Sequence, residues 1–390
     1  MLNFKKNRYE KIIPEKPFSR IFFNPIFAIY FVITLILTLA LNIASRESIW
    51  FSNWYANCIY KRLVYVIGGI SSFAPFSVAE ILLYVLIIVS IIKLFYNLIN
   101  IIRYAFKKMY NGCLYHLFLF IRYVITMGIT LLLCFTLTCG INYHRFSFVY
   151  YSDLEVKDYD VDTLIDLCNH IIDNLNECSK NVHRDEYNVF SLENTDYTYE
   201  AKLSLERLSM AYPVLAGFYP DAKPIINSKL MSYSFITGIY APFTIEANYN
   251  NDMPDINYPF TICHELSHLR GFMREEEANF IAYLACRESS CVEFNYSGYI
   301  NALSYVLSAL YPNVTPEEYS AIYNSIDKYV ILDLTYDSVY WNNFVTPVKE
   351  IASTVNDTYL KANNQQDGVI SYGRIVDLML ADYVKNVYIK

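Results

Sequence analysis

The sequence is poor in the residues that most structural metal sites use. It has six histidines in 390 residues, and its nine cysteines include no Cys-x-x-Cys pair. A cysteine-based zinc site is therefore not expected. Repeats and low-complexity stretches are also missing, and long apolar runs are absent after residue 141. The later part of the chain is broken and polar in pattern, as in a soluble domain.

Positive charge is scarce in the C-terminal part. Residues 1–145 carry 15 Lys/Arg and 4 Asp/Glu, whereas residues 146–390 carry 16 and 34. The acidic part argues against nucleic acid as a partner, because binding to phosphates needs positive charge. A basic, apolar first part and an acidic second part predict a membrane anchor over residues 1–145, followed by a soluble domain over residues 146–390.

Three apolar runs lie in the first part, at about 25–44, 78–98 and 117–141. Each is near the ~20 residues that a helix needs to cross a bilayer, so the lipid bilayer is an expected partner. No small-residue cleavage pattern follows the first run, which indicates an anchor rather than a removed signal peptide. Residues 63–76 are apolar but too short to span, and they predict an interfacial or re-entrant segment.

Basic residues indicate how the spans are oriented. Six precede the first span and three lie between the second and the third: Lys5, Lys6, Arg8, Lys11, Lys16 and Arg20, then Arg103, Lys107 and Lys108. The positive-inside bias places the N-terminus and the 99–116 loop in the cytoplasm. The sequence thus predicts a multi-pass protein of the cell membrane, with residues 146–390 outside the cytoplasm.

The soluble part mixes two periodicities. Helical spacing over 161–175 and 199–211, and from Pro259 nearly to the end, predicts helices with breaks at Gly271, Ser290, Pro312 and 363–368. Residues 231–249 are rich in β-branched and aromatic residues and predict two short strands or an irregular ribbon. The expected fold is three transmembrane helices followed by a mainly helical α+β domain with a small sheet.

His264, Glu265 and His268 form an HExxH pattern in the segment that begins at Pro259. On a helix, two histidines four residues apart project from one face and can bind one metal ion. Glu265 beside them can take a proton from a water that the ion activates. Because the chain has only six histidines, this spacing is seldom a coincidence.

A catalytic zinc usually has three protein ligands and keeps a position for water. No histidine follows His268, so a third ligand downstream must be a carboxylate. Three consecutive glutamates come after the helix breaker Gly271, which would let a second helix fold back on the first. Glu275 and Glu277 differ by roughly 200° around a helix, so only one can face the metal. The face of Glu275 continues in small residues, which favours Glu275.

The pattern resembles the gluzincin type of metallopeptidase, in which a second helix carries Glu-x-x-x-Asp. The resemblance implies a zincin-like domain with Glu275 as the third zinc ligand (Glu277 as the alternative) and Glu265 as the general base. It also implies that Asn279, in place of the Asp, supports a ligand histidine. In metzincins, a third histidine would fall at Arg274, so that class is not expected.

The chain also resembles an uncharacterised bacterial family of multi-span proteins with a HELxHxxGFxREdEANFxAYLAC block. Here that block is His264–Cys286, and the resemblance extends to 238–248, 296–299 and 371–380. Candidate supporting residues from these blocks are Tyr240, Glu246, Asn248, Tyr299, Tyr372 and Arg374. Residues 244–248 are a candidate edge strand for an extended peptide.

Together these patterns predict a membrane-anchored zinc metallopeptidase that acts on peptide, protein or cell-wall amide bonds. An intramembrane protease is disfavoured, because polar sequence and not an apolar span flanks the motif. The non-enzymatic alternative is a zinc-sited membrane sensor or receptor. Glu265 favours the enzyme, since a purely structural site needs no general base.

The orientation predicts the behaviour of reporter fusions. A reporter that is active only outside the cytoplasm is expected to work when fused after residue 150 and to fail when fused near residue 108, because the basic loop stays inside. The reverse pattern would place the acidic domain in the cytoplasm.

Overall fold

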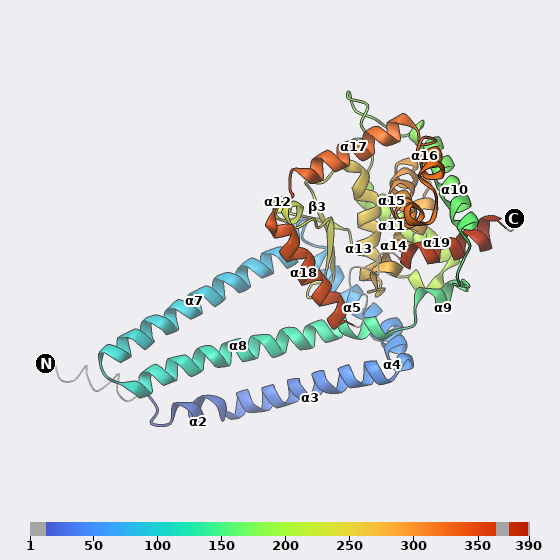
Figure 1. Ribbon diagram of the computed structural model, residues 1–390. Coiled ribbons are helices and arrows are strands. Elements are labelled where there is room, and N and C mark those ends of the chain that lie inside the picture. Colours follow the sequence, from blue (N-terminus) through green and yellow to red (C-terminus); the bar gives the residue numbers. More distant parts are fainter. Residues whose placement is uncertain (1–12, 364–373, 389–390) are drawn as a thin grey trace. The chain divides into compact units, whose positions relative to one another are not determined.

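The computed structural model describes residues 13–363 and 374–388 and divides into two compact units (Figure 1). One comprises Met1–Ser48 and Ala79–Ile141, and the other comprises Ile49–Val78 and Asn142–Lys390. This division differs in one respect from an anchor over residues 1–145: the segment between the first two apolar helices packs with the C-terminal unit.

The first unit contains α2 (Pro17–Phe22) and three long apolar helices, α3 (Pro25–Glu47), α7 (Val78–Phe106) and α8 (Tyr110–Thr138). In the described part of the chain, these three are the helices long and apolar enough to cross a membrane, and each predicted run falls on one of them. Helix α8 contacts α3, and side-chain hydrogen bonds join it to α7. Asn42 on α3 donates to Thr136 at 3.0 Å, and the hydroxyls of Ser90 on α7 and Tyr123 pair at 2.8 Å.

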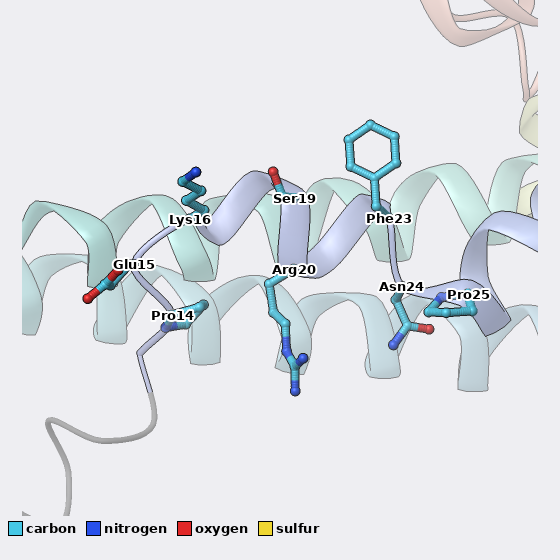
Figure 2. A pocket seen from close by; sticks show the side chains of 8 residues that line it. All are labelled: Pro14, Glu15, Lys16, Ser19, Arg20, Phe23, Asn24 and Pro25. Carbon is cyan, nitrogen blue, oxygen red and sulfur yellow. The ribbon is translucent and has the colours of Figure 1, made fainter.

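A hollow beside α2 is lined by one short stretch of chain, from Pro14 to Pro25 (Figure 2). Lys16, just before α2, and Arg20, on α2, project in different directions. The lining contains a single carboxylate, Glu15, and no histidine or cysteine. It is therefore no candidate for a metal centre, and its basic residues suit the flank of a membrane span.

The second unit is mostly helical. Its helical elements are α4 (Ile49–Trp54), η1 (Tyr55–Tyr60), α5 (Lys61–Leu63), η2 (Val64–Gly68), α6 (Gly69–Ser71), η3 (Gly140–His144), α9 (Phe148–Ser152), α10 (Val161–Ser179), α11 (Tyr197–Ala211), η4 (Pro213–Leu215), α12 (Ser228–Tyr233), η5 (Asp255–Asn257), α13 (Tyr258–Leu269), α14 (Glu275–Arg287), α15 (Val292–Leu310), η6 (Tyr311–Asn313), α16 (Pro316–Tyr323), α17 (Lys328–Asn342), α18 (Pro347–Ala362), α19 (Ile375–Tyr383) and η8 (Val384–Tyr388). The predicted helices at 161–175 and 199–211 are confirmed as α10 and α11. Breaks occur at Gly271, Ser290 and Pro312 as predicted, whereas the last predicted break lies mostly outside the described residues.

A three-stranded sheet accompanies these helices, with the order β1 (Lys223–Ile225), β3 (Glu246–Asn250), β2 (Gly238–Ala241). Strand β3 pairs parallel to β1 and antiparallel to β2, with Tyr240 opposite Ala247. The expectation that residues 244–248 form an edge strand was therefore wrong. Most of that segment belongs to the central strand, which already has a partner on both sides.

Helix α13 lies in the core of the second unit, in contact with β2, β3, α11, α14 and α15. Eleven of its twelve residues are buried, and the exception is His264. A helix that is buried all round needs apolar packing on every side, which its neighbours supply. His264 therefore marks the side on which the helix is accessible.

A buried ion pair connects the sheet to the chain that precedes α7. Lys223 Nζ lies 2.5 Å from Glu246 Oε1, and their side chains are 5% and 1% exposed. Lys223 also donates to the Ser71 carbonyl at 2.5 Å, and the Glu246 carboxylate accepts from the Val78 backbone at 3.2 Å. These contacts give the sequence candidate Glu246 a structural role.

Glu246→Ala is expected to lower the thermal stability of the purified full-length chain, because Lys223 would stay buried without its counter-ion. Loss of one partner of a buried pair typically costs about 3–5 kcal/mol. The double variant Lys223→Met/Glu246→Leu should lose less, since neither charge remains. Thermal unfolding in detergent compares the three proteins, and an unchanged midpoint for Glu246→Ala would contradict the role of the pair.

Candidate metal centre

Local hydrogen bonds fix where α13 ends. The Gly271 N–H donates to the His268 carbonyl at 2.8 Å, and the Phe272 N–H donates to the Ser267 carbonyl at 3.2 Å. This pair of bonds is a Schellman motif, which needs a left-handed residue after the helix. Gly271 has a φ of 91°, which side-chain-bearing residues rarely adopt. The chain reverses there, and α14 begins at Glu275 against α13.

Three side chains from α13 and α14 converge across this turn. Glu275 Oε2 lies 3.3 Å from His264 Nε2, and Glu275 Oε1 lies 3.6 Å from His268 Nε2. One ligand atom from each side chain falls within 4.8 Å of the others, and the described residues hold no second cluster of this kind. Two imidazoles and one carboxylate are a ligand set typical of catalytic zinc.

The rival carboxylate of Glu277 points elsewhere. It accepts from the Phe148 backbone N–H at 2.9 Å and from Arg274 at 3.3 Å, and its residue is buried. A carboxylate with these partners helps to dock the Phe148 segment on α14. The structure thus brings Glu275, and not Glu277, to the two histidines, on the small-residue face of α14.

Hydrogen bonding orients the His268 ring. Its Nδ1 donates to the Phe272 carbonyl at 2.8 Å, which leaves Nε2 facing Glu275. Metal-binding histidines commonly donate their second nitrogen to a carbonyl in this way. Burial is the main cause that lowers the pKa of His268, to about 4, and the neutral ring is the form that binds a metal.

His264 has a different environment. Burial lowers its pKa, but the hydrogen bond and negative charge of Glu275, with a smaller contribution from Asn279, raise that pKa overall. Asn279 is buried beside the ring, as expected for a residue that supports a ligand histidine. Within the described chain, however, His264 Nδ1 and the Asn279 amide nitrogen lack hydrogen-bond partners. No hydrogen bond therefore joins the Asn279 amide nitrogen to His264 Nδ1, where such a bond would orient the imidazole ring.

Glu265 is buried next to the cluster. Burial raises its pKa to about 8. The charge of His264 and the hydrogen bond from the Tyr240 backbone N–H act to lower this pKa, whereas the charge of Glu275 raises it further. A Cβ on Gly238 would lie 2.5 Å from Glu265 Oε1, so only glycine leaves room for the carboxylate. Glu265 Oε2 has no hydrogen-bond partner among the described residues. A cation at the cluster would favour the ionised form of this carboxylate.

The residues present therefore fit a divalent metal. The three ligands are buried or half-buried, and a carboxylate with one unpartnered oxygen lies beside them. Cysteine makes no contribution to the cluster, and all nine cysteines are free thiols, so Cys286 and Cys291 form no disulfide.

A family profile described as "Protein of unknown function (DUF3810)" matches residues 55–380, which is most of the chain. The chain belongs to this family. The matched region includes α13 and α14 and therefore the whole cluster, while the description names no activity. No curated protein and no solved structure matches the chain.

Two sequence candidates of this DUF3810 chain lie in the sheet near the cluster. Tyr240 on β2 reaches Glu265 through its backbone N–H, and its hydroxyl pairs with the Tyr60 hydroxyl at 2.8 Å. Asn248 on β3 is fully buried and donates to the Glu246 carbonyl at 3.4 Å. Tyr240 thus positions the general-base candidate, whereas Asn248 is part of the sheet interior.

Two of the remaining candidates, Tyr299 and Arg374, are not brought to the cluster. Tyr299 is buried on α15, with its ring 6.2 Å from that of Tyr283. Arg374 is exposed at the start of α19, and Tyr372 lies outside the described residues. A different tyrosine, Tyr305 on α15, lies close enough to Glu275 to feel its charge. Burial and then the charge of Glu275 raise the pKa of Tyr305. No local pattern distinguishes Tyr305 among the 38 tyrosines, because only the packing of α15 places it there.

The two rival carboxylates, Glu275 and Glu277, are expected to differ in their effect on metal binding. Glu275→Ala is expected to lower zinc affinity by more than the roughly 10–100-fold typical for loss of a supporting group, because it removes a ligand. Glu277→Gln is the matched control and should keep its affinity. Chelator competition on the purified full-length chain measures both.

The histidines provide the complementary test. The double variant His264→Ala/His268→Ala is expected to contain no stoichiometric zinc by elemental analysis, whereas the parent chain binds about one ion. Full zinc content in that variant would show that the metal is held elsewhere.

Proposed function

We propose that this protein is a membrane-anchored zinc metallopeptidase with a zincin-like domain outside the cytoplasm. One observation carries the proposal: the buried Glu265 carboxylate, with a free oxygen, lies beside the His264, His268 and Glu275 cluster. Two imidazoles and one carboxylate leave a zinc ion with room for water and substrate. A buried carboxylate next to such a site is suited to proton transfer.

The chemistry divides between the ion and the chain. A zinc ion held by His264, His268 and Glu275 would polarise the scissile carbonyl and lower the pKa of water toward ~7. Glu265 takes the proton of the attacking water on its free oxygen. The Tyr240 N–H holds the Glu265 carboxylate in place during this step. Glu265 then gives the proton to the amine nitrogen as the carbon–nitrogen bond breaks.

A tyrosine hydroxyl and the edge strand β2 also support amide hydrolysis as the reaction. The phenol of Tyr305, near Glu275, is a donor of the kind that stabilises the oxyanion formed from the carbonyl. Strand β2 pairs only with β3 among the described strands, and its Tyr240 N–H faces Glu265. An extended peptide beside β2 would pass close to the general base. Peptides, proteins and cell-wall cross-links all offer such an amide.

A zinc-sited sensor is the non-enzymatic alternative. It would use the same three ligands, but it gives no reason for the buried Glu265 carboxylate with an unpartnered oxygen beside them. Keeping an ionisable group in such surroundings has a cost, and proton transfer is the usual function that offsets it.

Glu265→Gln is expected to keep zinc bound and the fold intact while turnover of a peptide library falls by about 10²–10⁴-fold, the usual contribution of a general base. Glu276→Gln, the same change in the neighbouring acidic run, should keep its activity. Unchanged turnover in Glu265→Gln would remove the proposed role. Zinc binding without cleavage by the parent chain would favour the sensor.

A further inference from the structure

Residues 49–71 form one continuous helical segment in which α-helical turns (α4, α5, α6) alternate with π-helical turns (η1, η2). Five of its seven buried residues recur every four positions, namely Ser52, Ala56, Tyr60, Val64 and Gly68; the other two are Tyr55 and Ser71. In a regular α-helix, a four-residue spacing drifts by about 40° per step. The wider π turns oppose this drift, so the buried row stays on one face.

Away from the buried row, most of the exposed residues are apolar. We call these exposed apolar residues the aromatic row; they are between 52% and 91% exposed, and they are Trp50, Trp54, Tyr65, Val66, Ile70 and, just after the helical segment, Phe73. Single apolar residues on a surface are common, but this many exposed along one short segment indicate a partner. Trp and Tyr are enriched where lipid head groups meet the hydrocarbon core. Arg62, exposed in the same segment, suits an anionic head group.

Chain connectivity identifies the partner. One residue, Ser48, separates this segment from α3, and α7 begins at Val78, directly after Ser77. Both helices are candidate membrane spans, so both ends of the segment leave the bilayer on the same side. We propose that residues 49–77 lie in the membrane surface, with the aromatic row in contact with lipid.

The buried face of the segment contacts the elements that form the metal centre. The Tyr60 hydroxyl donates to the carbonyl of Leu269, the last residue of α13, at 3.1 Å. Because that bond uses its only proton, Tyr60 accepts from the Tyr240 hydroxyl at 2.8 Å. Gly68 lies against the turn between β2 and β3, where an added Cβ would be 3.4 Å from the Ile245 carbonyl.

This arrangement has a consequence for the substrate, which rests on the proposed function. The segment that lies in the lipid surface is bonded to the end of the HExxH helix and to the strand that positions Glu265. The metal centre is therefore held close to the bilayer. The amide that it cleaves belongs to a substrate presented at the membrane surface, such as the membrane-proximal part of an anchored protein.

Tryptophan fluorescence tests the lipid contact. The chain has three tryptophans: Trp50 and Trp54 in the row, and Trp341 on α17, which packs against Phe235 and Tyr340. The full-length variant Trp341→Phe reports on the row, and the matched variant Trp50→Phe/Trp54→Phe reports on Trp341. Each is reconstituted in phosphatidylcholine vesicles with or without brominated acyl chains. The first variant should lose most of its emission to the bromine, and the second should lose little.

A third variant tests the middle of the segment, far from both spans. Tyr65→Trp, in a background without the native tryptophans, is expected to be quenched by brominated lipid and protected from aqueous iodide. Quenching of Trp50 and Trp54 but not of this reporter would overturn the proposal, as would equal weak quenching of the first two variants. The readout needs neither zinc nor substrate, so its failure is distinguishable from failure of the hydrolase proposal.

Discussion

The contact between the Glu275 carboxylate and the imidazoles of His264 and His268 is the interaction on which the site depends. It requires α14 to run back along α13, and the left-handed Gly271 makes that reversal possible. The same turn presents the Phe272 carbonyl to His268 and so fixes the orientation of its ring. One short turn therefore places the third ligand and orients the second.

Burial dominates the electrostatics of the centre. It raises the pKa of Glu265 to about 8 and lowers that of His268 to about 4, so both shifts favour the neutral form. A divalent cation would reverse the first shift and agree with the second, because it stabilises a carboxylate and binds neutral imidazole. Strand β2 positions the Glu265 carboxylate beside the cluster, because Gly238 leaves space for it and the Tyr240 N–H donates a hydrogen bond to it.

Local patterns were sufficient for the parts of the structure that local physics decides. The apolar runs, the helical periods and the HExxH spacing all fall on helices, and the small-residue face distinguished Glu275 from Glu277. Strand order was not predictable, because it depends on the parallel pairing of β1 with β3, whose partners lie 25 residues apart in sequence. For the same reason, the sequence could not reveal that Tyr305 approaches Glu275.

The ligand set itself is tested most directly by X-ray absorption at the zinc edge of the purified full-length protein. We expect a first shell of about four nitrogen and oxygen atoms at ~2.0–2.2 Å, with the outer-shell scattering of two imidazoles and no sulfur. A zinc–sulfur distance of ~2.3 Å, or a shell without imidazole, would contradict it.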